Sequence, residues 1–177
     1  MNNYSPWELL EKEARQILPL FSAYIYTRQL RDRPRLMADH LCYVCGTTEQ
    51  YQLLFNDLSQ RATLVSEEII SGKRVVYFRL HGRIESCIGD ILYIELAEPN
   101  ACDNKKSAFT HIEVYPADQK HIYSIVDVLT HNQDTFTFTG GVSSPQYDIV
   151  IDQSSGFTLR IRERPFIEKI NTAREST

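Results

Sequence analysis

The sequence predicts an α+β fold in which a βαβββ module occurs twice after an N-terminal helical extension. Runs in which β-branched or aromatic residues alternate with polar ones predict strands, and apolar residues at helical spacing predict helices. The order strand, helix, strand, strand, strand is found over residues 36–98 and again over 108–177. Each module also carries a histidine in its first strand and a glutamate in its last strand, at nearly equal spacing: His40 with Glu95, and His111 with Glu163. This arrangement indicates a duplicated module with one shared metal site.

The first 35 residues are expected to form a helical extension that packs on the core. Ser5 is a suitable N-cap and Pro6 is tolerated at the first helical position. Pro19 is expected to kink or end this helix, because proline lacks the backbone N–H and its ring clashes with the preceding turn. A second helical segment is then predicted over residues 21–31.

The first module begins with a strand over residues 37–45 that has His40 at its centre. Gly46 ends this strand, and a helix begins at Thr47 or Thr48. The remaining strands are predicted at 63–70, 74–80 and 88–96, with Glu95 in the last of them and Ser71-Gly72 as a tight turn between the first two.

The second module repeats this order with a strand over residues 109–115 that carries His111. A helix follows over about 117–130, and further strands are predicted at 134–139, 147–151 and 157–163. A last helix is expected over 165–173.

Composition limits the classes of function. The chain of 177 residues has 42% hydrophobic and 24% charged residues, which is typical of a globular protein. No apolar run approaches the roughly 18 residues of a membrane span, and the N-terminus lacks the features of a signal peptide. A net charge of −4 gives no basic surface for a phosphate backbone. We therefore expect a cytoplasmic protein with no nucleic-acid or membrane partner.

The spacing of Cys42 and Cys45 is that of a zinc knuckle or redox pair. Positions three apart in a strand point to opposite faces, however, so the two sulfurs are not expected to share a metal. We expect the four cysteines to be reduced and to pack as small hydrophobic side chains.

Several short phrases, in this order and spacing, resemble a known family. They are Ala38-Asp39-His40, Phe78-Arg79-Leu80-His81, Tyr93-Ile94-Glu95-Leu96, His111-Ile112-Glu113-Val114 and Ser143-Ser144-Pro145. Over residues 36–170 the chain resembles the YecM-like metalloenzymes of the vicinal oxygen chelate superfamily, which includes glyoxalase I, bleomycin resistance proteins and extradiol dioxygenases. The resemblance implies that the two modules form a cupped, partly open barrel of mixed β-sheet.

The resemblance also implies a site and a chemistry. His40, Glu95, His111 and Glu163 would hold one divalent ion, which could be Zn, Mn, Fe, Co or Ni. The chain would be a metal-dependent isomerase, lyase or dioxygenase that acts on a small oxygen-bearing metabolite. Glu95 and Glu163 would be the catalytic carboxylates, because a ligand glutamate that leaves the metal can accept a proton. Glu113 is either a substitute for Glu95, an acceptor for His111, or a solvated carboxylate at the rim.

Further candidate site residues follow from the alternation of side chains along strands. Tyr77, Arg79 and His81 share one face of their strand, where Arg79 is a candidate for binding a substrate carboxylate and His81 for a general base. The alternative, which is slightly favoured, is an exposed edge strand whose charges discourage aggregation. Tyr93 and Tyr115 are candidates for substrate binding, because they share the faces of Glu95 and His111.

In the last predicted strand, the side chain of Glu163 points to the opposite face from those of Arg160 and Arg162. If Glu163 faces the site, Arg160 and Arg162 point toward the helices or toward solvent. Two other functions remain open: a non-catalytic protein that binds a small molecule, and a structural module in which the histidines only belong to the core. Both a monomer and a homodimer are compatible with the sequence.

Overall fold

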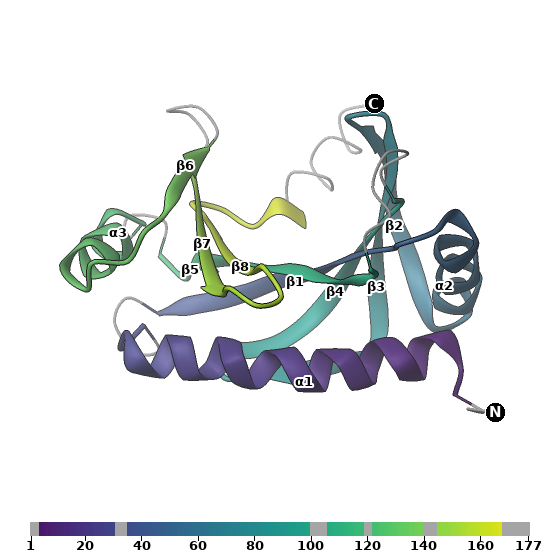
Figure 1. Cartoon of the computed structure of the whole chain (residues 1–177), viewed down its shortest axis with the longest axis horizontal. Coiled ribbons are helices and arrows are strands. Elements are labelled where there is room, and N and C mark those ends of the chain that lie inside the picture. The colour runs from purple at the N-terminus through teal and green to yellow at the C-terminus, as the bar shows by residue number, and fades with distance from the viewer. Residues whose placement is uncertain (1–3, 31–34, 100–105, 119–121, 140–144, 168–177) are drawn as a thin grey trace.

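The protein is an open, eight-stranded mixed sheet with helices packed on it (Figure 1). The computed structural model describes residues 4–30, 35–99, 106–118, 122–139 and 145–167. Helix α1 (Pro6–Thr27) comes first. The first module contains β1 (Leu36–Val44), α2 (Thr48–Arg61), β2 (Ala62–Ile70), β3 (Lys73–Ser86) and β4 (Gly89–Ala97). The second contains β5 (Ala108–Pro116), α3 (Ile122–His131), β6 (Thr137–Thr139), β7 (Gln146–Asp152) and β8 (Phe157–Arg162). The predicted α+β class with two βαβββ modules is confirmed.

The strand order β2-β3-β4-β1-β5-β8-β7-β6 shows how the modules combine. In each module the first and last strands are parallel neighbours, β1 with β4 and β5 with β8. The modules meet where β1 and β5 pair antiparallel. The two histidine-bearing strands therefore lie side by side at the centre of the sheet.

Helix α1 is continuous, so the predicted break at Pro19 is wrong. Leu18 and Phe21 on either side of the proline are buried against the core, whereas Pro19 itself is exposed. The carbonyl left without its helical N–H donor belongs to Arg15, which is also an exposed residue. The loss of one hydrogen bond at this place is therefore tolerated.

The start of α1 is held by a reciprocal cap. The Ser5 hydroxyl accepts from the Glu8 N–H at 3.2 Å, and the Glu8 carboxylate accepts from the Ser5 N–H at 2.7 Å. Replacing Ser5 with alanine should lower the free energy of unfolding by about 1 kcal/mol, because a helix N–H loses its acceptor. Urea denaturation measures this loss. Ser124→Ala, at an exposed position inside α3, is the control and should change stability little; equal losses would contradict the capping role.

The two faces of the sheet have different roles. Leu41 and Tyr43 of β1 join the main core cluster, which lies on the side of the helices. His40 and Cys42 alternate with them and point to the other face, which also holds a smaller apolar cluster around Tyr77. This alternation was predicted for β1 and β5, and it determines which side chains can share a site.

Some boundaries differ from the prediction. Strand β3 extends beyond residue 80 to Ser86, and its pairing with β4 is irregular between Arg79 and Ile84. The expected closing helix over 165–173 lies largely outside the described residues, as does Cys102. Cys42 and Cys45 are buried and free. Among the described residues, the model contains no helix with the length and hydrophobicity needed to cross a membrane.

Candidate metal centre

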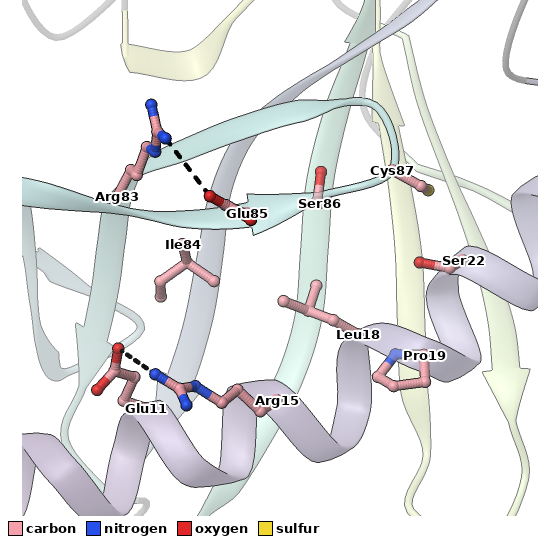
Figure 2. Close-up of a pocket in the computed structure, with 10 residues that line it drawn as sticks. All are labelled: Glu11, Arg15, Leu18, Pro19, Ser22, Arg83, Ile84, Glu85, Ser86 and Cys87. Atoms are coloured by element: carbon pink, nitrogen blue, oxygen red, sulfur yellow. Dashed lines mark hydrogen bonds and ion pairs between the residues drawn. The ribbon is translucent and has the colours of Figure 1, made fainter.

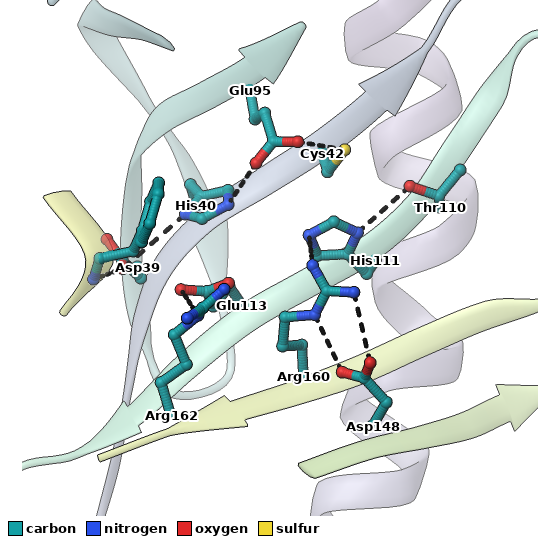
Figure 3. A network of polar contacts seen from close by, with 11 residues as sticks. Asp39, His40, Cys42, Glu95, Thr110, His111, Glu113, Asp148, Arg160 and Arg162 are labelled. Atoms are coloured by element: carbon teal, nitrogen blue, oxygen red, sulfur yellow. Dashed lines mark hydrogen bonds and ion pairs between the residues drawn. The ribbon is translucent and has the colours of Figure 1, made fainter. Parts of the chain in front are cut away.

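The central strands bring two histidines and a glutamate together (Figure 3). Strand register places Cys42 of β1 beside Glu95 on one side and beside His111 on the other. His40 Nε2 lies 3.1 Å from Glu95 Oε2, and the rings of His40 and His111 are 5.9 Å apart between centroids. One potential ligand atom from each of His40, Glu95 and His111 lies within 4.8 Å of the others.

These residues adjoin a pocket of about 390 Å³ on the face of the sheet opposite the main core. Glu95, His111 and Glu113 line it, whereas His40 is fully buried beneath it. The other lining residues are Cys42, Val44, Ile70, Ser71, Lys73, Val75, Tyr77, Ala97, Thr110, Arg160, Arg162 and Phe166. The pocket therefore combines potential metal ligands, three basic side chains and an apolar wall.

The hydrogen bonds of His111 define its tautomer. Arg160 Nη1 lies 3.1 Å from His111 Nε2, and Thr110 Oγ1 lies 3.2 Å from Nδ1. Because a guanidinium only donates, Nε2 carries the lone pair and Nδ1 carries the proton. Burial and the charge of Arg160 lower the pKa of His111 to about 3. His111 is therefore neutral, as a metal ligand must be.

His40 has the opposite electrostatic environment. Burial alone would lower its pKa, but the carboxylates of Glu113, Asp39 and Glu95 raise it to about 10. Its Nδ1 lies 3.7 Å from Asp39 Oδ2 and has no hydrogen-bond partner among the described residues. Without a metal, His40 is therefore a buried cation surrounded by carboxylates.

Two carboxylates support His40 from its other side. Asp39, His40 and Glu113 form a second group of adjacent potential ligands. Asp39 accepts a hydrogen bond from the Phe166 N–H, and Glu113 Oε1 forms an ion pair with Arg162 Nε at 2.8 Å. Burial raises the pKa of Glu113, although His40 and Arg162 oppose this shift. Because both carboxylates already have partners, we assign them to the support of His40 rather than to a second ion.

The residues present fit a divalent ion. Two imidazoles and a carboxylate are suitable ligands for Zn, Mn, Fe, Co or Ni, and three protein ligands leave positions open for water or substrate. Burial raises the pKa of Glu95, but the hydrogen bond and charge of His40 outweigh it and hold that pKa far below its usual range. An ion would take over the position of the His40 proton. Its binding through His111 Nε2 would require Arg160 to release that nitrogen.

The structure brings some predicted residues to the site and not others. Tyr77 lines the pocket, while Tyr93 packs on the small apolar cluster and Tyr115 is half-buried near the end of β5. Arg79 and His81 are exposed, because β3 turns them toward solvent, and His81 contacts Thr63. These two positions agree with the alternative of an exposed strand with solvated charges.

Glu163 is not brought to the site. It follows the end of β8, belongs to neither group of potential ligands and is absent from the residues that line the pocket. Arg160 and Arg162 face the pocket instead, so the predicted direction of these arginines is corrected. The sequence contains the signal, because Phe157, Leu159 and Ile161 alternate with them and are buried in the core.

A larger pocket of about 680 Å³ lies between α1 and the end of the β3–β4 hairpin (Figure 2). Its charged side chains are already paired with one another: Glu11 with Arg15 at 3.0 Å, and Arg83 with Glu85 at 3.4 Å. Neither group of potential metal ligands in the described part of the chain includes a residue from this pocket. It is therefore a weaker candidate for a catalytic site.

Comparison with known proteins identifies the family. A family model described as YecM protein matches residues 11–158. The chain belongs to the YecM family. A solved structure titled "Structural Genomics, Protein EC4020" has a TM-score of 0.67 at 18% identity over 91% of each chain. Methylmalonyl-CoA epimerase from Mycobacterium tuberculosis has a TM-score of 0.50 at 15% identity, over 77% of this chain and 93% of that one.

These likenesses show that this YecM family member shares its fold with both proteins. A search of curated proteins found no match.

Proposed function

We propose that this YecM family member is a divalent-metal-dependent enzyme of the isomerase type that acts on a small oxygen-bearing molecule. The observation that carries the proposal is the convergence of His40, Glu95 and His111, whose ligand atoms lie within 4.8 Å of one another beside a pocket. We choose the isomerase type because methylmalonyl-CoA epimerase from Mycobacterium tuberculosis, which by its name catalyses an isomerisation, shares the fold.

An isomerase of this kind needs a group that stabilises an oxyanion and a group that moves a proton. A bound divalent ion supplies the first by polarising a substrate oxygen. Glu113 is our candidate for the second, because it lines the same pocket and burial raises its pKa, which makes its carboxylate a better proton acceptor. Tyr77, which also lines the pocket, has its pKa raised by burial and by Glu95, so its hydroxyl stays protonated and can donate a hydrogen bond.

Metal content tests the proposal. Purified wild-type protein should contain about one equivalent of a transition metal by inductively coupled plasma mass spectrometry after reconstitution. His40→Ala and His111→Ala should each lose the metal, because each removes one of three protein ligands. His131→Ala, which changes an exposed histidine at the end of α3, is the matched control and should retain it.

Two results would contradict the proposed centre. One is a wild-type protein that takes up no transition metal. The other is a His40→Ala or His111→Ala protein that remains folded by circular dichroism and keeps the wild-type metal content.

A further inference from the structure

Strand β8 places an anchored arginine beside the candidate ligands (Figure 3). Arg160 Nε and Nη2 donate to the two oxygens of Asp148 at 2.9 and 3.3 Å. This two-point contact with β7 fixes the plane of the guanidinium and directs Nη1 to His111, at 3.1 Å. A cationic donor is therefore held next to the nitrogen that is a candidate for binding the metal.

Two more cations line the same pocket. Arg162 pairs with Glu113 and lies over the Phe166 ring at 4.9 Å. Lys73, at the start of β3 in the other module, also lines the pocket. The pocket thus has three basic side chains, which a metal site alone does not explain.

The formal charges of the pocket and its supports favour a monoanion. Lys73, Arg160 and Arg162 oppose the four carboxylates of Asp39, Glu95, Glu113 and Asp148. With both histidines neutral, as they would be as metal ligands, these residues sum to −1, and a bound divalent ion would bring the total to +1. A single carboxylate would neutralise that charge, whereas a dianion such as phosphate would leave a net charge of −1.

We propose that the ligand of this pocket is a small monocarboxylic acid whose carboxylate binds Arg160, supported by Arg162. This inference rests on the proposed metal-dependent function and names the class of its substrate. If an ion took the place of Arg160 at His111 Nε2, the freed Nη1 N–H would be able to donate to a substrate carboxylate. Because Nη1 lies 3.1 Å from Nε2, that carboxylate would lie beside the candidate ligand.

Binding of acids and their neutral amides tests this inference. Full-length, metal-loaded protein is titrated with pyruvate and with phenylglyoxylate, each beside its amide and beside inorganic phosphate. Protein chemical shifts in nuclear magnetic resonance spectra report binding into the millimolar range. At least one acid should bind about tenfold or more tightly than its amide, and more tightly than phosphate.

Variants locate the site of this preference. Arg160→Gln should reduce the affinity for the acid about tenfold or more while leaving that for the amide nearly unchanged. Arg160→Lys keeps the charge opposite Asp148 and should show a smaller loss, which guards against a folding defect in the glutamine variant. Arg79→Gln removes the same charge from an exposed position outside the pocket and should bind as the wild type does.

Metal content measured on the same samples separates the two proposals. If the metal is present but neither acid is preferred over its amide or over phosphate, or if Arg160→Gln keeps the preference, the carboxylate site is wrong and the metal centre stands. If no metal is bound but the preference exists and depends on Arg160, the metal centre is wrong and the carboxylate site stands.

Discussion

Metal affinity should rise about tenfold for each pH unit between about pH 7 and pH 9, because the ion must displace one proton from the site. His40 has its pKa raised from 6.5 to about 10 and is therefore protonated over this range in the metal-free protein. His111, with a pKa lowered to about 3, is already neutral and releases none. Isothermal titration calorimetry in buffers of different ionisation enthalpy should detect one proton released per ion.

Glu113→Gln is the informative variant for this proton release. The charge of Glu113 is the largest influence that raises the pKa of His40, so its removal should lower that pKa and flatten the pH dependence near neutral pH. Glu67→Gln, at an exposed position on β2 outside the pocket, should leave the pH dependence unchanged. An affinity that does not vary with pH in the wild type would show that His40 is not protonated before the metal binds.

Phe21→Ala should lower the free energy of unfolding by about 3–5 kcal/mol, because it leaves a cavity where α1 packs on the sheet. Phe21 is fully buried in the main core cluster. For a chain of this size the change corresponds to a fall in melting temperature of roughly 6–20 °C. Thermal unfolding followed by circular dichroism measures it.

The neighbouring residue supplies the control for the core prediction. Leu20 is 43% exposed, so Leu20→Ala should cost much less than Phe21→Ala. If the two variants unfolded at the same temperature, the buried side of α1 would contribute no more to stability than its exposed side, which would contradict the packing of α1 in the core.

The alternation of side chains along strands explains why much of the candidate site could be predicted. In β1, β4 and β5 a period of two residues places Cys42, Glu95 and His111 on one face, and all three line the pocket. The repeated order of elements and of His and Glu predicted one site shared by the two modules, but not which strands are neighbours. Residues near strand centres were therefore placed well.

The prediction failed where side-chain direction depends on tertiary contacts or on the end of a strand. Glu163 lies one position beyond β8, so spacing from His111 did not reveal which way it points. Pro19 was expected to kink or end α1, because the sequence alone does not show that Pro19 and Arg15 are both exposed on the packed helix. The pairing of Arg160 with Asp148 joins β8 to β7, and only the sheet register reveals it.

The antiparallel pairing of β1 with β5 also has a consequence for the order of folding. The β2–β3 and β3–β4 pairs join strands that are adjacent in the chain, whereas β1 and β5 close a long loop around most of the first module. Contacts between distant segments cost more loop-closure entropy and tend to form late. We therefore expect His40 and His111 to come together in one of the last folding steps, which would make the metal a reporter of the completed native state.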